Sequence, residues 1–444
     1  MLPAAYDVHC ARLENGLELF LLPAADVPLV AVSVWYRVGS RHDPPGHSGM
    51  AHLLEHMLYK GSARYPRGEY DRRLHAEGAV HNASTWFDRT QFAILLGADR
   101  YRLALELEAD RMRGALLSAS DVRDEIGVVL HELQAGRDEP GARFFEELHT
   151  VAWPRHPYGR PVAGWAGEVA ALDAAALRRF YDDHYWPDNA YLVIAGDFEI
   201  GRMQADIDAT FGSIRARPGT AGTAGTDPAT CAATAAGPQD ARDGHAQVDL
   251  APGERRFELR RVGGQEEITF AYRVPGRADR DAYALDLLAQ LLGHGRTSRL
   301  YRALVAPGHA VHVAAENMSL LRDPYFFCLD VEPVPGVPAT CLEALVEAEI
   351  ARLGREPVAA AELASVCKRV RADFILRSER LAARTALVGE LEASVGWTYL
   401  STYLERLAAV TPHELLAAAR RCLQPDRRVI GHYRPRPAPV DGGQ

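Results

Sequence analysis

Two histidines and a glutamate stand together in the segment His52-Leu53-Leu54-Glu55-His56. At about 100° per residue, His52, Glu55 and His56 share one face of a helix, and the neighbouring apolar residues fall on the opposite face. Imidazoles four residues apart can converge on one metal ion, and a carboxylate beside them can take a proton from water that the metal activates. The alternative is a surface helix rich in His and Glu, so a third ligand decides between them.

The segment 120–133 supplies that ligand. Its apolar residues recur at helical spacing, and Glu125 and Glu132 are seven residues apart, which places them on one face. His131 points about 100° away from Glu132 and is the weaker candidate. Two histidines and one carboxylate leave a fourth position open, which is typical of a catalytic zinc site. A solvated surface carboxylate is the alternative for Glu132.

The ends of the two helices are also predicted. Ser48 is the expected N-cap of the first helix and Gly61 its expected stop, because Ser side chains cap amino ends and Gly ends helices. Ser120 is the expected cap of the second helix.

The H-x-x-E-H order, followed by Glu132 in a Val-Val-Leu-x-Glu helix, resembles the inverted zinc-binding peptidases. These are the pitrilysin, insulin-degrading enzyme and mitochondrial processing peptidase group, and the chain length is similar to the processing-peptidase branch. The resemblance implies that His52, His56 and Glu132 bind one Zn²⁺ per chain. It also implies that Glu55 is the general base and that Glu125 supports the site from behind. Further segments resemble the family: Asn82-Ala83-Ser84-Thr85, His156-Pro157-Tyr158-Gly159, Tyr185-Trp186-Pro187-Asp188-Asn189 and the stretch 293–302.

The second half departs from the family pattern, which has an Arg followed seven residues later by a Tyr, both binding substrate. Counting from Arg302 reaches His309, and an alignment with two inserted residues reaches Val311. We therefore expect Arg302 to bind substrate without its Tyr, and a homologous subunit carrying the Arg/Tyr pair to complete a heterodimer, or otherwise a homodimer. In the first half, Asn82 and Ala83 are expected to pair with the backbone of an extended peptide substrate.

Composition excludes several classes of protein. The 444 residues carry a net charge of −9, and nucleic-acid binders need a basic face, so no nucleic-acid partner is expected. No apolar run has membrane-spanning length, so no membrane partner is expected. The six scattered cysteines indicate neither a disulfide framework nor a Cys-based zinc site. The first residues lack the pattern of a signal peptide, which favours the cytoplasm, although a chain whose leader had been removed would fit the periplasm equally.

The chain is expected to have two halves. Residues 215–247 are rich in Gly, Ala and Thr and predict a flexible linker between an N-terminal zinc-bearing half, 1–214, and a C-terminal half without metal, 248–444. Each half begins with strands and continues with helices. This pattern predicts an α+β fold of two homologous α/β sandwich halves, each a mixed or antiparallel sheet with helices packed on it, in a clam-shell arrangement.

Two function classes follow. The first is a zinc endopeptidase that hydrolyses unfolded peptides in an enclosed chamber, as the catalytic subunit of a heterodimer. The second is a non-catalytic scaffold or assembly subunit with the same fold. The intact set of His52, Glu55, His56 and Glu132 favours the peptidase, because a scaffold has no physical need for it.

Overall fold

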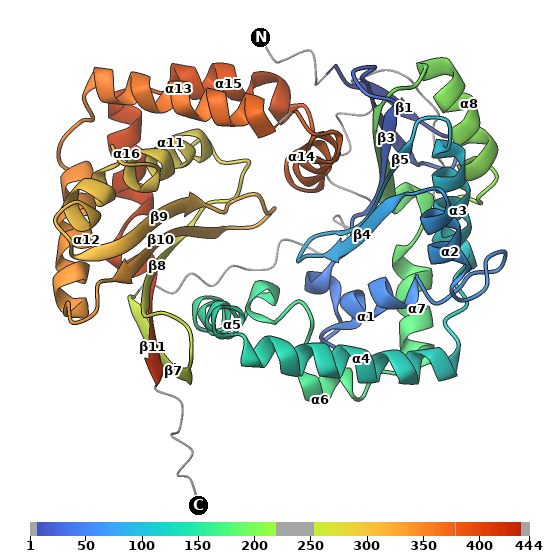
Figure 1. Ribbon diagram of the computed structural model, residues 1–444, viewed down its shortest axis with the longest axis horizontal. Coiled ribbons are helices and arrows are strands. Elements are labelled where there is room, and N and C mark those ends of the chain that lie inside the picture. The colour runs from blue at the N-terminus through green and yellow to red at the C-terminus, as the bar shows by residue number, and fades with distance from the viewer. Residues whose placement is uncertain (1–6, 219–252, 378, 437–444) are drawn as a thin grey trace, which may run out of the picture. The chain divides into compact units, whose positions relative to one another are not determined.

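The computed structural model describes residues 7–218, 253–377 and 379–436. These residues form two compact units (Figure 1). The first, unit 1, comprises the described residues of Met1–Leu133, Arg160–Ala246 and Ile375–Ser401. The second, unit 2, comprises those of Gln134–Gly159, Gln247–Phe374 and Thr402–Gln444.

Unit 1 is built on a six-stranded mixed sheet with the order β1-β2-β6-β3-β5-β4. Only the β2–β6 pair is parallel, and β4 is an edge strand. All seven residues of β6 are buried, which is typical of a strand covered on both faces. The strands are β1 (His9–Arg12), β2 (Glu18–Pro23), β3 (Leu29–Tyr36), β4 (Val80–Thr85), β5 (Thr90–Gly97) and β6 (Ala190–Gly196).

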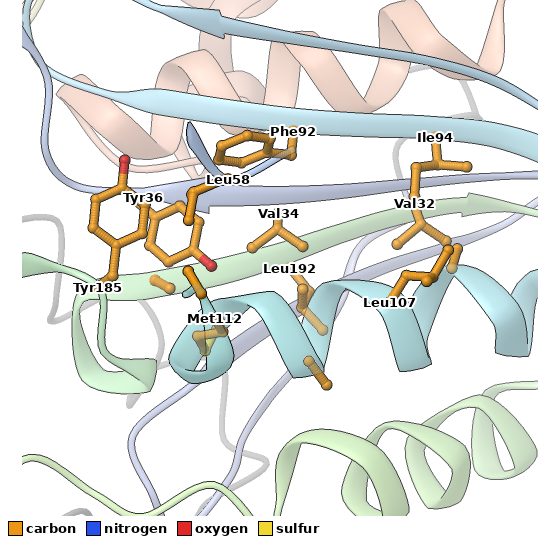
Figure 2. Close-up of a cluster of buried hydrophobic side chains, with 14 of the residues drawn as sticks. Val32, Val34, Tyr36, Leu58, Phe92, Ile94, Leu107, Met112, Tyr185 and Leu192 are labelled. Carbon is orange, nitrogen blue, oxygen red and sulfur yellow. The ribbon is translucent and has the colours of Figure 1, made fainter. Parts of the chain in front are cut away.

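One face of this sheet is covered by helices of the first half of the chain. Figure 2 shows Val32 and Val34 of β3 meeting Leu107 and Met112 of α3 in the buried core. The helices of this half in unit 1 are α1 (Met50–Met57), α2 (Glu69–Ala76), α3 (Tyr101–Gly114), most of α4 (Ala119–Asp138), α6 (Ala166–Val169), α7 (Ala174–His184) and α8 (Ile200–Phe211).

A helix of the second half, α14 (Leu381–Ser394), packs on β3 and β6 of unit 1. Its Gly389 lies so close to Trp35 that an added Cβ would be 2.1 Å from the indole ring. The buried guanidinium of Arg37 bridges Glu18 of β2 at 2.7 Å and Glu392 of α14 at 2.6 Å. A helix of the second half therefore packs on the sheet of the first half.

Unit 2 repeats this plan with a five-stranded sheet in the order β7-β11-β8-β10-β9, in which only β7 and β11 are parallel. A helix of the first half, α5 (Pro140–Ala152), packs on β7 and β11. The strands are β7 (Arg255–Val262), β8 (Glu267–Val274), β9 (Ala310–Asn317), β10 (Tyr325–Pro333) and β11 (Arg428–Arg436). The helices that the second half contributes to unit 2 are α11 (Ala282–Gly293), α12 (Ala339–Leu353), most of α13 (Ala360–Arg377), most of α15 (Tyr399–Ala409) and α16 (Pro412–Cys422).

The two sheets have the same topology once β1 is set aside. β2-β6-β3-β5-β4 corresponds to β7-β11-β8-β10-β9, with the parallel pair in the same place. The expected two-part fold, with mixed sheets and helices packed on them, is thus confirmed. The boundaries 1–214 and 248–444 stay a prediction, and residues 219–247 of the expected linker lie outside the described residues. No helix in the described ranges is both long and apolar enough to cross a membrane.

Candidate metal centre and active site

The helix α1 presents the first two candidate ligands, and its amino end is held by Asp43. The two oxygens of this buried carboxylate accept hydrogen bonds from the backbone N–H groups of Gly49, at 2.7 Å, and Ala51, at 2.9 Å. The prediction that Ser48 caps this helix is wrong, because the helix begins at Met50 and its N-cap is Gly49. The Ser48 hydroxyl accepts a hydrogen bond from the backbone N–H of Trp165 instead. A carboxylate six residues upstream satisfies N–H groups that the cap leaves open.

The carboxyl end of α1 and the start of α4 also differ from expectation. α1 ends at Met57, four residues before the expected stop at Gly61. α4 begins at Ala119, and the Ser118 hydroxyl accepts a hydrogen bond from the backbone N–H of Asp121 at 3.2 Å. Ser118 therefore makes the capping hydrogen bond that was expected of Ser120.

The structure brings His52, His56 and Glu132 together. Their candidate ligand atoms all lie within 4.8 Å of one another. The Nε2 atom of His52 is 4.0 Å from one Glu132 oxygen, and that of His56 is 3.5 Å from the other. Zinc takes nitrogen and oxygen ligands at about 2.0–2.2 Å, so atoms about 3–4 Å apart can share one ion. This donor set fits zinc.

The environment of the two imidazoles agrees with that fit. Burial, and then the neighbouring His56, lower the pKa of His52 to about 4, so the ring is neutral at pH 7, as a metal ligand must be. The Nδ1 atom of His56 lies 3.0 Å from Glu125, which leaves Nε2 to face the centre. Glu132 is 54% exposed, so the centre opens to solvent on that side.

Glu55 lies beside this group without belonging to it. Glu55 is 9% exposed, and its carboxylate accepts a hydrogen bond from the hydroxyl of Thr85, with 2.6 Å between the oxygens. Burial raises the pKa of Glu55 above its ordinary value, and the bond from Thr85 opposes that rise. A carboxylate whose pKa is raised toward neutrality is suited to exchange a proton with a reacting group.

Two residues of the site were missed from the sequence. Thr85 is the last residue of β4, and Lys60 follows α1 and ion-pairs with Glu125 at 2.6 Å. Lys60 is four residues after His56, the spacing at which helical neighbours share a face, and this was the available signal.

Asn82 and Ala83 lie on the edge strand β4. In the described part of the chain β4 pairs only with β5, where Asn82 is opposite Ala93 and Ala83 is opposite Phe92. The outer edge of β4 can therefore accept an added strand.

Arg302 belongs to unit 2. It lies in the π-helical turn η5 (Tyr301–Val305), its side chain is exposed, and Nη2 is 3.6 Å from Glu362. It is thus not among the residues that unit 1 gathers around the candidate centre.

Comparison with known proteins gives these residues a family context. Residues 21–165 match the model described as insulinase, peptidase family M16, and residues 171–370 match the model of the peptidase M16 inactive domain. This chain carries the N- and C-terminal domains of peptidase family M16. All of the candidate centre in unit 1 lies in the part that matches the first model.

Curated relatives of this M16 chain are named zinc proteases. The zinc protease PqqE of Helicobacter pylori is 28% identical over 83% of this chain and 79% of its own length. An uncharacterized zinc protease of Streptomyces coelicolor is 27% identical over 96% of this chain and 89% of its own length.

Solved structures of proteases share the fold. A protease from Helicobacter pylori has a TM-score of 0.85 at 24% identity, covering 97% of this chain and 100% of that chain. The periplasmic protease PqqL from Escherichia coli has a TM-score of 0.77 at 18% identity, covering 97% of this chain and 48% of that chain.

Proposed function

We propose that this chain is a zinc-dependent endopeptidase of the inverted-zincin type that hydrolyses unfolded peptides. The observation that carries the proposal is the convergence of His52, His56 and Glu132 with Glu55 beside them. A structural zinc site would be closed by four protein ligands, whereas three ligands and an exposed side suit catalysis.

Each residue has a separate task in this proposal. Zinc at the centre would polarise the scissile carbonyl and activate a water molecule. Glu55 takes the proton from that water and passes it to the leaving amine, as a base of raised pKa can. Glu125 orients His56 through Nδ1.

The edge of β4 gives the proposal its substrate class. An extended peptide added beside Asn82 and Ala83 would exchange backbone hydrogen bonds with the strand. A folded protein cannot offer such a segment, so unfolded peptides and oligopeptides are the proposed substrates, held in an enclosed chamber.

The second half motivates a partner. Val311, the residue aligned with the family's Tyr, is on the edge strand β9 and is 60% exposed, and it has no group that could donate to an oxyanion. The other alignment puts His309 there, just before β9. We propose that a homologous subunit supplies an Arg/Tyr pair and that this chain is the catalytic member of a heterodimer, or otherwise of a homodimer. The chain's cytoplasmic location, or a periplasmic one after removal of a leader, is likewise a proposal.

The second candidate is a non-catalytic scaffold subunit. It is favoured by the match of residues 171–370 to a model described as an inactive domain. The donor set in unit 1 favours the peptidase, since a scaffold gains nothing from three convergent metal ligands and a base.

One experiment separates the two candidates. The purified chain, with and without a homologous partner, is analysed for zinc and tested on unstructured fluorogenic peptides before and after treatment with a chelator. The peptidase requires about one zinc per chain and cleavage that stops with the chelator and returns with zinc. A chain that binds no zinc, or binds zinc and leaves every peptide intact in each combination, is a scaffold.

A further inference from the structure

Lys60 forms the outer end of a side-chain relay that reaches the candidate zinc site. Its Nζ atom is 2.6 Å from Oε2 of Glu125, and Oε1 of the same carboxylate is 3.0 Å from Nδ1 of His56. The Glu125 side chain is only 5% exposed and that of Lys60 25%, so little water competes for these contacts. One carboxylate thus joins a cation to a candidate ligand.

The backbone around Lys60 fixes its position. Directly after it, Gly61 has φ of +123°, and a Cβ there would lie 2.9 Å from the backbone nitrogen of Arg67, so another residue would be strained. Gly61 accepts a hydrogen bond from the N–H of Leu116 at 3.2 Å, and Ser62 forms a β-bridge with Ala115. These contacts tie the end of α1 to the segment just before α4. Lys60 is therefore held opposite α4.

The ammonium group of Lys60 neutralises negative charge at the site. The carboxylate of Glu125 lies 3.0 Å from the imidazole of His56, and that of Glu132 lies 3.5 Å from the same ring and 4.0 Å from His52. A buried carboxylate without a partner is strongly destabilising. In the described residues, Lys60 provides the ammonium that pairs with Glu125.

We propose that Lys60 is a positioning residue of the metal centre, a role that rests on the proposed zinc peptidase function. Its ammonium holds one oxygen of Glu125, so that the other oxygen stays aligned with Nδ1 of His56. The imidazole is then fixed with Nε2 toward the ion, as second-layer carboxylates fix ligands in other metal sites. Lys60 acts through Glu125 and touches neither metal nor substrate.

The test measures zinc affinity by competition with a chromogenic chelator at one pH. Lys60→Met removes the ammonium and keeps most of the volume, and we expect about 10–100-fold weaker zinc binding. Lys60→Arg keeps a cation and should recover most of the affinity. The matched control is Arg67→Met, because Arg67 ion-pairs with Asp121 of α4 at 2.9 Å from the same loop, on the exposed surface. It should leave zinc affinity unchanged.

A double variant makes the result specific. In a Glu125→Gln background, Lys60→Met should lower zinc affinity no further, since the residue through which Lys60 acts is already neutral. This variant contains no unpaired buried carboxylate, so it tests the role even if Lys60→Met alone does not fold.

The outcomes are distinguishable. A wild-type chain that binds no zinc overturns the proposed function and the role of Lys60 with it. A wild-type chain that binds zinc overturns only the role of Lys60 if Lys60→Met matches Arg67→Met, or if Lys60→Met weakens zinc binding equally with and without Glu125.

Discussion

The hydroxyl of Thr85 donates a hydrogen bond to Glu55, with 2.6 Å between Oγ1 and Oε2. Thr85 ends the edge strand β4 and Glu55 lies on α1, so the bond joins the strand proposed to bind peptide to the proposed base. Both residues are buried, at 8% and 9% exposure. A hydrogen bond to a charged group in such a setting contributes about 1.5–3 kcal/mol.

We therefore expect Thr85→Val to impair chemistry without releasing zinc. The substitution keeps the shape of the side chain and removes the hydroxyl that donates to Glu55. The Glu55 carboxylate then loses its fixed orientation, and its pKa rises further because the bond from Thr85 no longer lowers it. kcat should fall about tenfold or more, as the loss of about 1.5 kcal/mol implies. Steady-state kinetics and zinc titration check this result. Thr85→Ser, which retains the hydroxyl, is the matched control, and equal kcat values for both variants would contradict the role.

Glu55→Gln separates metal binding from proton transfer. Gln keeps the size and can still accept the bond from Thr85, but it cannot take a proton from water. We expect normal zinc content and peptide affinity with turnover lower by about 10²–10⁴-fold. Cleavage near the wild-type rate in zinc-loaded Glu55→Gln protein would remove Glu55 from the base role.

The three candidate ligands should differ in what their loss does. The His52→Ala/His56→Ala pair removes two of three ligands and should abolish stoichiometric zinc, whereas Glu132→Gln keeps a weak oxygen ligand and should lower the affinity strongly. Elemental analysis after dialysis measures the first effect and chelator competition the second. His131→Ala is the control, because His131 lies outside the group of convergent ligands and is exposed. Stoichiometric zinc in the double alanine variant would place the metal elsewhere.

The sequence predicts which site residues share a face when they lie on the same helix. The spacing of His52, Glu55 and His56 on α1 determines their common face, and the same periodicity puts Glu125 and Glu132 on one face of α4. Lys60 and Thr85 were missed because their partners are far along the chain, and only the packing of α1 against α4 and β4 brings them near. The bonds from Gly49 and Ala51 to Asp43 were missed for a different reason, because a carboxylate six residues before the N-cap follows no regular capping pattern.

The fold shows the same limit. The position of a strand such as β8 follows from its apolar run, but no local pattern shows that α14 covers the sheet of unit 1 or that α5 covers the sheet of unit 2. That exchange depends on contacts such as Gly389 against Trp35 and the ion pair of Arg37 with Glu392, which join residues more than 350 positions apart. Surface complementarity of this kind is not periodic.

The contribution of two buried histidines to the stability of the metal-free protein should fall as the pH drops below 6.5. Burial lowers the pKa of His149 and His184 to about 4 each. Between about pH 6.5 and 4 these two side chains are therefore protonated in the unfolded chain and neutral in the folded chain. Each such histidine contributes stability that is present above pH 6.5 and lost toward pH 4, with a slope of up to about 1.4 kcal/mol per pH unit. Urea unfolding at several pH values measures the slope. His184→Asn should flatten it, and substitution of the exposed His47 should not.

The last prediction concerns the partner, and the missing Tyr motivates it. A scissile carbonyl that gains negative charge needs donors beyond the metal, and the loss of one such donor typically costs about 10²–10³ in kcat. Neither Val311 nor an Arg302 that ion-pairs with Glu362 supplies an Arg/Tyr pair. We expect the isolated chain to bind zinc and to cleave peptides slowly, and a homologous subunit with that pair to raise kcat by about 10²-fold or more. Size-exclusion chromatography and peptide cleavage are measured for the chain alone, for the mixture, and for the mixture with the partner's Tyr changed to Phe. The Phe variant should still assemble but should lose the gain. Full activity in a chain shown to be monomeric would exclude the two-chain site and make His309 the next residue to replace.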